Sequence, residues 1–497
     1  MLKRLPGRLI ATFVAVTLLS LIFYASTLVV SYSDLLRRDD PLLRTDVARL
    51  TSVRIERADE VHGLEELQSV VREAADQGLK VSISGSRHSQ GGHTYIEGGV
   101  VLDMRGFNRV LDIDSVAMTV TVESGATWDE VQHAIAPQGL AIKVMQSSNI
   151  FTVGGTLSAN AHGRDIDVTQ VVEVVERFRL LLADGSVVEV SRDENPELFS
   201  LVIGGYGLYG VILDVCLRVT RDELYRQVAV PMDYTEFPTY FAQQKADSAV
   251  AMMLARPSID PDPDAFLREL VVVTWRRGDV GQPGSFELTK EENVLRDKFF
   301  FNLSRRFNWA KSLRWYGQKR IEMGPGETRT VSRNNAMRPP LAPLKLLDYR
   351  SSRDTDIIQE YYIPVERFVP FMDRFRDILV AGNLNVLSAT VRYVTPNSTP
   401  ALAYAPSGDV FAIIQMSNVG LSADAQAHAE AVTRQLVEAA LEHGGTYYLT
   451  YQLYPTLEQL HRAYPRAGYA FERKRFYDPD EVFTSQFYER YGHNQPR

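Results

Sequence analysis

The stretch most informative about the fold reads Ser84-Gly85-Ser86-Arg87-His88-Ser89-Gln90-Gly91-Gly92-His93. It follows residues 80–84, which alternate as in a strand, so a strand runs directly into a turn of small residues. Glycine permits positive φ, and successive backbone N–H groups in such a turn can converge on an anion such as a pyrophosphate. Arg87 would add positive charge. The segment has neither the Gly-Lys-Ser/Thr of a Walker loop nor the G-x-G-x-x-G of a Rossmann site.

Two later segments share this character. Residues 149–163 read Asn149-Ile150-Phe151-Thr152-Val153-Gly154-Gly155-Thr156-Leu157-Ser158-Ala159-Asn160-Ala161-His162-Gly163, a tight turn that opens a short helix of small residues. Residues 204–212 read Gly204-Gly205-Tyr206-Gly207-Leu208-Tyr209-Gly210-Val211-Ile212, a glycine-dense turn that feeds a strand. A helix N-terminus or a glycine turn can face a phosphate or a ring edge. Each segment alone is equally consistent with a structural turn.

The surrounding pattern predicts a mixture of helices and short strands. Thr127 with Glu130 three residues later is a capping box, which predicts a helix that ends near Pro137 and Gly139. Asp184-Gly185 suits the turn of a hairpin. Further expected elements are helices over residues 64–74, 365–379 and 423–443, and strands over residues 100–103, 118–122, 178–183 and 187–190.

The N-terminus carries a long apolar segment. Lys3, Arg4 and Arg8 precede an uncharged stretch from residue 9 to 33, long enough as a helix to cross a hydrocarbon core of about 30 Å. An uncleaved anchor fits better than a signal peptide, whose apolar region is roughly 7–15 residues long. A cleaved signal stays open as the alternative. The basic head would remain in the cytoplasm and place the rest of the chain on the extracytoplasmic side.

Composition narrows the class of protein. The chain has 497 residues, which predicts two or three domains. Its net charge of -8 argues against a nucleic-acid partner. The one cysteine, Cys216, lies in an apolar run and is expected to be a buried strand residue. Nine scattered histidines give no metal-ligand spacing, and no G-x-S-x-G motif indicates a hydrolase.

Taken together, in this order and at these separations, the three glycine-bearing segments resemble the FAD-binding PCMH-type domain of the vanillyl-alcohol-oxidase and p-cresol-methylhydroxylase superfamily. The ending Arg473-Lys474-Arg475-Phe476-Tyr477-Asp478-Pro479-Asp480-Glu481-Val482-Phe483 is also similar to the family's. Within this superfamily, the chain resembles the sugar-alcohol and aldonolactone oxidases. Gly444-Gly445-Thr446-Tyr447-Tyr448 and Tyr464-Pro465-Arg466 resemble the decaprenylphosphoryl-ribose oxidases in particular. The likeness is strong over residues 51–222, moderate over 357–497 and slight over 225–350.

This resemblance implies an α+β fold with a two-subdomain FAD-binding domain and a substrate or cap domain that has an antiparallel sheet and flanking helices. The implied organisation is a membrane helix at 1–33, a polar stalk at 34–50, the FAD-binding domain at 51–222, the cap at 223–455 and a return to the FAD domain at 456–497. The implied activity is oxidation of a hydroxyl carbon of a small polyol, sugar or lactone-like substrate. Electrons would pass to flavin and then to oxygen or another acceptor.

The family's cofactor contacts carry over residue by residue. The pyrophosphate would be held by Ser84, Gly85, Ser86, Arg87, His88 and Ser89. The isoalloxazine and phosphates would be lined by Gln146, Thr152, Val153, Gly154, Gly155, Ser158, Ala159, Asn160, His162 and Gly163. Gly210 and Ile212 would contact the adenine or ring side.

Three histidines are weighed separately. In the aldonolactone oxidases, the histidine before serine in the first loop is tethered to the flavin 8α-methyl, and His88 stands there. In the decaprenylphosphoryl-ribose oxidases the flavin is free, so both states stay open. His93 is interpreted as a loop-surface histidine, and His162 as a residue of the cofactor pocket.

On the substrate side, hydride removal needs a base for the hydroxyl proton and a cation where negative charge develops. The family uses a Glu-x-Arg strand and a late lysine. Arg392 keeps the arginine, whereas Thr390 stands at the glutamate position and Tyr451 at the lysine position. Tyr451 or its neighbour Tyr448 could accept the proton if Arg392 lowers the pKa of the phenol. Gln415 is a weaker candidate for the same pocket.

Two alternatives follow. A membrane anchor would favour a dehydrogenase that delivers electrons to a quinone or a protein partner. The missing glutamate and lysine would also suit a membrane-tethered binding protein that kept the fold without the chemistry.

Overall fold

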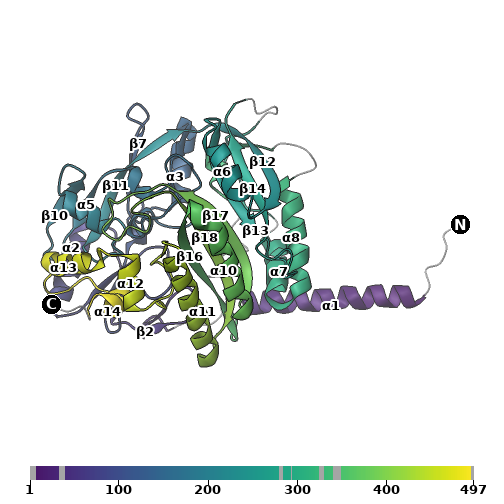
Figure 1. The fold of residues 1–497 in the computed structure, drawn as a ribbon. Helices are drawn as coiled ribbons and strands as arrows, with labels where there is room; N and C mark the ends of the chain where they lie inside the picture. The colour runs from purple at the N-terminus through teal and green to yellow at the C-terminus, as the bar shows by residue number, and fades with distance from the viewer. Residues whose placement is uncertain are drawn as a thin grey trace.

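The computed structural model describes residues 7–32, 40–278, 284–292, 294–323, 329–339 and 349–493. Helix α1 (Gly7–Tyr32) confirms the apolar helix expected at the N-terminus, and its stretch Leu9–Ser26 has no side chain buried against the rest of the chain. It extends away from the body of the molecule (Figure 1). Length and composition allow it to cross a membrane, and a signal sequence would look the same. Lys3 and Arg4 lie outside the described residues.

The stalk predicted at 34–50 is wrong over residues 40–50, the part that the structure describes. β1 (Leu43–Thr45) pairs antiparallel with β2 (Ser52–Arg54), and Val47 and Ala48 are buried. The buried Asp46 carboxylate accepts hydrogen bonds from the Gln452 side chain at 2.6 Å and from Gly91 N at 3.2 Å. These contacts fix the segment to the body because two apolar side chains and one fully bonded carboxylate are buried together.

The first sheet is small and parallel. Its order is β3 (Arg57–Glu60), β5 (Val100–Asp103) and β4 (Val81–Ser84), and α2 (Leu64–Asp76) packs its apolar side against it. The end of the chain returns here, since Val81 N donates to Val482 O at 2.7 Å and Phe483 is fully buried in the same cluster. The loop of residues 84–93 therefore begins at the carboxyl end of β4, a strand held by β5 on one side and by residues 482–483 on the other.

The second sheet is antiparallel. It contains β6 (Val110–Asp114), β7 (Thr119–Glu123), β8 (Leu140–Ile142), β9 (Val175–Leu181), β10 (Val187–Ser191) and β11 (Val211–Arg221). The capping box is confirmed at α3 (Trp128–Ile135), where Thr127 and Glu130 bond reciprocally. The predicted hairpin is also confirmed as the pair β9 and β10. Its turn is wider than two residues, and within that turn only Gly185 has a positive φ. Cys216 is buried in β11, as predicted. The helices α4 (Val153–Ser158) and α5 (Pro196–Val202) lie between these strands in sequence.

The third sheet has eight strands. In order they are β15 (Arg329–Ser332), β12 (Leu224–Asp233), β14 (Glu269–Arg276), β13 (Val250–Pro257), β17 (Asn385–Val394), β18 (Val410–Gly420), β16 (Asp354–Pro364) and β19 (Thr446–Tyr447). Its helices are α6 (Phe237–Lys245), α7 (Val294–Arg306), α8 (Asn308–Met323), α9 (Arg333–Ala336), α10 (Phe368–Ala381) and α11 (Ala423–Glu442). The helix predicted at 365–379 is a 3₁₀ turn followed by α10, and the predicted long helix is α11, followed by Gly444 at φ +75°.

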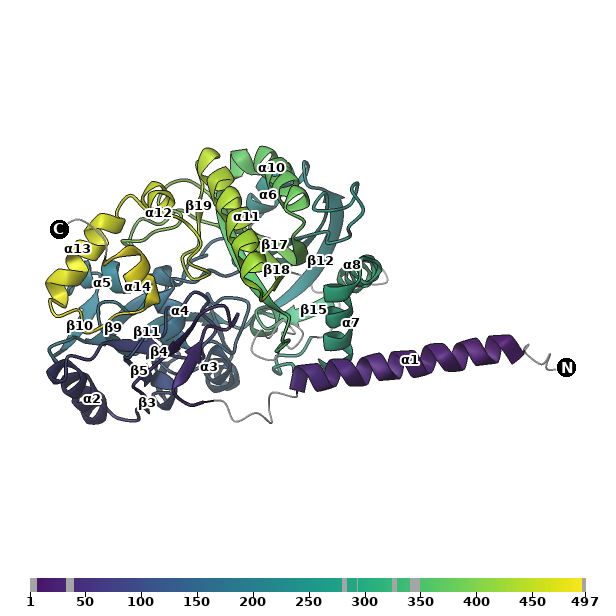
Figure 2. The same cartoon turned by 90° about the horizontal axis from the view of Figure 1, so that it is seen from below.

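The central strands of this sheet have two different faces. Figure 2 shows α10 and α11 lying over β17 and β18. Side chains alternate along a strand, so odd-numbered residues such as Tyr361 and Phe411 pack among the helix aromatics Phe371 and Phe368. The even-numbered residues point to the opposite face, which looks onto the first two sheets. The remaining helices, α12 (Leu457–Ala463), α13 (Ala467–Tyr477) and α14 (Gln486–Tyr491), close the C-terminal end.

Candidate active site

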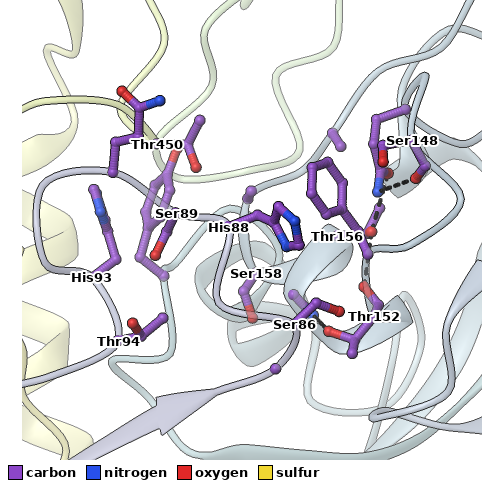
Figure 3. A pocket seen from close by; sticks show the side chains of 18 of the residues that line it. Ser86, His88, Ser89, His93, Thr94, Ser148, Thr152, Thr156, Ser158 and Thr450 are labelled. Carbon is purple, nitrogen blue, oxygen red and sulfur yellow. Dashed lines mark hydrogen bonds between the residues drawn. The ribbon is translucent and has the colours of Figure 1, made fainter. Parts of the chain in front are cut away.

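A cavity of about 390 Å³ lies where the three sheets meet. Its walls combine the loop after β4, the segment around α4, the turn before β11 and the even-numbered face of β16, β17 and β18. The three glycine-bearing segments, far apart in sequence, are therefore brought together around one hollow. Figure 3 shows Ser86 and His88 from the first segment beside Thr152, Thr156 and Ser158 from the second.

The first segment is held by contacts with the second. Ser86 Oγ donates to Ile150 O at 2.7 Å, and the His88 and Phe151 rings meet edge to face at 4.8 Å. Arg87 has φ +57°, a left-handed conformation that is uncommon outside glycine. The backbone N–H groups of Gly85, Ser86, Arg87 and Ser89 donate to no acceptor in the described part of the chain. This turn can therefore offer several N–H groups to one anion.

The second segment is built for close approach. Thr152 caps α4 by accepting from Gly155 N at 3.3 Å. A Cβ on Gly85 would lie 2.2 Å from Thr152 Oγ1, and one on Gly154 would lie 2.8 Å from Ser124 Cβ. Trp128 Nε1 donates to Thr156 Oγ1 at 2.8 Å, and Thr156 donates to Gln146 at 3.1 Å.

The third segment turns on residues with positive φ. Gly204, Tyr206, Gly207 and Gly210 have φ values of +78°, +54°, +77° and +145°. A Cβ on Gly210 would lie 2.4 Å from Leu181 O. The cavity-facing Gly210 and Ile212 thus enter β11 through a turn that glycine makes possible.

The sheet wall places a carboxylate in the cavity. Thr390 on β17 pairs with Ile414 on β18, which pairs with Glu360 on β16, so the three form one row across the sheet. All three line the cavity. The position that the family fills with glutamate is threonine here, but the same row carries Glu360 two strands away.

Glu360 belongs to a hydrogen-bonded group of buried side chains. Its Oε1 is hydrogen-bonded to His162 Nε2, and both side chains are 3% exposed. Its Oε2 accepts from Tyr451 O–H at 3.2 Å. Arg392 lines the same wall and donates to Ser147 Oγ and, at 3.4 Å, to His162 O. A carboxylate, a histidine, a phenol and a guanidinium therefore face one hollow.

The condition set for a phenol as proton acceptor is not met. Burial raises the pKa of Tyr451 well above its usual value, and the neighbouring Glu360 raises it further, while Arg392 opposes this only weakly. Burial also raises the pKa of Tyr448, whose O–H donates to Ala159 O at 2.8 Å. Both line the cavity, but neither is poised to ionise. Burial lowers the pKa of Arg392, with Glu360 acting in the opposite direction.

Most of the residues predicted from the sequence line this cavity. They are Ser84, Gly85, Ser86, Arg87, His88, Ser89, Gln146, Thr152, Gly154, Gly155, Ser158, Ala159, His162, Gly210, Ile212, Arg392, Tyr448 and Tyr451.

Four predicted residues lie elsewhere. Val153 is fully buried in the core, and the Asn160 side chain bonds to Gln170 at 2.9 Å. Gly163 N donates to Thr169 O at 2.8 Å. Gln415 is odd-numbered on β18, so it points away from the cavity and bonds to Ser417. A short turn directs only part of its residues to one side, which the linear sequence does not reveal.

His93 is not a surface histidine, contrary to the prediction. It is 5% exposed, its Nε2 lies 2.8 Å from Leu449 O, and its ring stacks on Phe487 at 5.1 Å. Burial lowers its pKa to about 4. Two glycines with positive φ, Gly91 and Gly92, fold the loop back so that His93 is covered.

Sequence reasoning missed Glu360. The signal available was an acidic residue between Gln359 and Tyr361 within an otherwise uncharged strand end, where a charge is unusual unless it is paired or functional. It also missed Ser124 and Ser147, which line the cavity from outside the three glycine-bearing segments.

The cavity has the donors and acceptors of a polar ligand site. Ser124 Oγ, Gln90 Nε2, His162 Nδ1 and Arg392 Nε are buried and have no partner among the described residues. All four residues line the cavity. Buried polar atoms are usually satisfied, so four unsatisfied ones on residues that line one hollow, beside a turn that can offer N–H groups to an anion, fit a large polar ligand.

Comparison with known proteins agrees with this geometry. Residues 58–191 match the family described as FAD binding domain. The chain is 26% identical over 439 residues to the decaprenylphosphoryl-beta-D-ribose oxidase of Mycolicibacterium smegmatis, covering 84% of this chain and 90% of that protein.

Two shorter similarities cover about a third of this chain. The mitochondrial L-galactono-1,4-lactone dehydrogenase of Arabidopsis thaliana is 30% identical over 168 residues, 34% of this chain and 27% of that protein. The L-gulonolactone oxidase of Mus musculus is 31% identical over 153 residues, 31% of this chain and 34% of that protein.

The fold, the cavity and these similarities define the class: this is a flavoprotein oxidoreductase with FAD as its cofactor. The resemblance to PCMH-type FAD oxidoreductases that the three segments indicated is confirmed, and its relatives include decaprenylphosphoryl-ribose and aldonolactone oxidases.

Proposed function

We propose that this chain oxidises a hydroxyl carbon of a small polyol, sugar or lactone-like substrate while anchored to a membrane by α1. The relatives' names point to sugar and lactone substrates, and they include both oxidases and a dehydrogenase. Oxygen, a quinone or a protein partner is therefore the final acceptor. The observation that carries the proposal is the carboxylate of Glu360 in the wall of the cavity that the three glycine-bearing segments enclose.

FAD bound in this cavity would supply the two-electron acceptor for a hydride from the substrate. The loop 84–89 would hold its pyrophosphate, because that turn carries the Arg87 side chain and backbone N–H groups that have no acceptor among the described residues. The residues around Thr152–Ser158 and Gly210 would lie along the rest of the cofactor, because they line the same cavity as that loop.

In this proposal Glu360 accepts the proton of the substrate hydroxyl. The His162 Nε2 hydrogen bond and the Tyr451 O–H at 3.2 Å orient its carboxylate. Arg392, in the same wall, offsets the negative charge that builds up when the O–H proton leaves. Tyr451 and Tyr448 then position other groups in the cavity and do not accept the proton themselves. Because Glu360 supplies a carboxylate, the absence of the family's glutamate no longer argues for a non-catalytic binding protein.

A second feature favours a substrate with negative charge. Arg164 and Arg392 both donate to Ser147 Oγ, Arg164 at 3.2 Å. Two guanidinium groups meeting at one cavity residue suit a phosphate or carboxylate on the sugar, since guanidinium groups bind such anions well.

The test is anaerobic reduction of the purified yellow protein by a panel of polyols, sugars, sugar phosphates and lactones. We expect bleaching by at least one class. Glu360→Gln should keep the flavin spectrum. The rate at which the substrate reduces the flavin should fall about 10²- to 10⁴-fold, as expected for loss of a general base. The matched control Glu366→Gln changes an exposed carboxylate, and its flavin should be reduced at the parent rate. A parent-like rate in Glu360→Gln would remove Glu360 from the mechanism.

We further propose that His88 is the covalent attachment point of the flavin. His88 lines the cavity with its ring against Phe151, on the loop assigned to the pyrophosphate. After acid precipitation the yellow colour should stay in the pellet, and in His88→Ala it should appear in the supernatant. Colour in the supernatant of the parent protein would show that the flavin is free.

A further inference from the structure

Helices α7 and α8 form a basic hairpin in an acidic protein. Between Val294 and Met323 there are eight Lys or Arg and two Asp or Glu, whereas the whole chain has a net charge of -8. Arg296, Arg306 and Arg320 are exposed, and two of them are ion-paired: Arg296 with Asp297 and Arg306 with Asp354. This local excess of positive charge lies on helices that do not line the cavity.

The same hairpin exposes large apolar side chains. Outside α1, fourteen large hydrophobic residues are exposed among the described residues, and seven of them lie here: Leu295, Phe300, Phe307, Trp309, Leu313, Tyr316 and Ile321. Trp309, Leu313 and Tyr316 are spaced i, i+4 and i+7, so they form one stripe along α8. Ala310 and Trp315 are buried on the other side of the helix. An exposed stripe of this kind marks a contact with another apolar phase.

The hairpin is continuous with the membrane helix. The ring of Phe23 lies 5.8 Å from Phe299 and 6.2 Å from Phe307, and Tyr24 lies 5.4 Å from Phe299. These α1 residues fall near the end of its apolar stretch Leu9–Ser26. In both Figure 1 and Figure 2, α7 and α8 lie at the edge of the body from which α1 extends.

The inner face of the hairpin is fixed to the catalytic sheet. Arg305 is buried and paired with Asp356, and Phe301 packs with Leu387 and with Met416, which lines the cavity. The hairpin therefore cannot move away from the sheet without breaking a buried ion pair, and its outer face is held in one orientation.

We propose that the α7–α8 hairpin lies on the surface of an anionic bilayer, the one that α1 enters. Aromatic side chains would sit at the level of the lipid headgroups, and the arginines would meet their phosphates. A second copy packed hairpin to hairpin would bring two equally basic faces together, whereas an anionic bilayer attracts this face and is the phase that α1 would enter. The inference rests on α1 as an anchor but not on the oxidative chemistry.

The chain contains its own reporter. Of its four tryptophans, Trp309 is 58% exposed, whereas Trp128, Trp275 and Trp315 are 1%, 5% and 3% exposed. The full-length protein is reconstituted in phosphatidylcholine vesicles with brominated acyl chains, with or without phosphatidylglycerol. We expect loss of most of the Trp309 emission in the vesicles that contain phosphatidylglycerol, and a smaller loss without it. Trp309→Phe should remove the quenchable component.

Controls separate surface contact from folding and from function. Leu313→Glu should abolish the quenching of Trp309, whereas Phe476→Glu, a similarly exposed apolar position on α13, should leave it unchanged. The flavin spectrum reports cofactor binding independently in each variant. Unquenched Trp309 in anionic vesicles, or quenching equal in both lipids, would overturn the proposal. Burial of Trp309 that rises with protein density instead of lipid charge would assign this face to a second copy.

Discussion

Glu360 and His162 form a buried hydrogen-bonded pair in the cavity wall. Both side chains are 3% exposed. Removing either one would leave the other as an unpaired polar group in the interior, which costs about 1–3 kcal/mol. Their place in the cavity wall, with Tyr451 bonded to the same carboxylate, suits the roles proposed for them above.

At the same scale, His93 should make folding stability depend on pH. Burial lowers its pKa from 6.5 to about 4, so the unfolded chain binds a proton that the folded chain rejects. This contribution to stability is fully present above pH about 6.5 and is lost as the pH falls toward about 4, by about 3 kcal/mol. His93→Gln, which keeps an N–H donor for Leu449 O, should flatten this slope in urea unfolding measured at several pH values.

The surface control for His93 is His62→Gln, whose side chain is 65% exposed. It should unfold with the parent pH dependence. An unchanged slope in His93→Gln would show that other groups govern the acid sensitivity of the fold.

At the scale of elements, local signals predicted the helices and strands but not their partners. The capping box at Thr127 and the glycine after α11 act within a few residues, so the sequence predicts them directly. Glu360 was missed because its row with Ile414 and Thr390 depends on antiparallel register between residues more than twenty positions apart in the chain. Gln415 was misplaced for the same reason, since the face that a strand residue occupies follows from pairing.

The burial of Asp46, Val47 and Ala48 could not be predicted for a similar reason. The segment is polar by composition, yet Asp46 finds its partners at Gly91 and Gln452, which are distant in sequence. The three glycine-bearing segments were predicted because each one combines turn chemistry with a following element. Which of their residues face the cavity was set by the packing of three sheets.

An element-scale prediction concerns the contact between the first two segments. A Cβ on Gly85 would meet Thr152 Oγ1 at 2.2 Å, and Thr152 cannot rotate away without losing the cap of α4. Gly85→Ala should therefore cost about 1–3 kcal/mol of stability and weaken FAD retention. Thermal unfolding and the ratio of flavin to protein absorbance measure both effects.

The matched control for Gly85→Ala is Gly468→Ala, which adds a methyl group at a helix position with no atom within 4 Å. It should leave flavin content unchanged and be neutral or slightly stabilising. Full flavin retention in Gly85→Ala would mean that the two segments tolerate separation.

At the scale of the whole molecule, the prediction concerns whether α1 anchors the protein in a membrane. Its 26 residues span about 39 Å, more than the hydrocarbon core of about 30 Å, and its apolar stretch is not buried by the rest of the chain. We expect the protein to stay in the membrane pellet after alkaline carbonate extraction, with an intact mass of 56.0 kDa. A cleaved signal would instead give a lighter protein that is released. The same outcome bears on the electron acceptor, because a tethered enzyme shares the bilayer with quinones. Dye or quinone reduction that exceeds oxygen consumption would then identify a dehydrogenase.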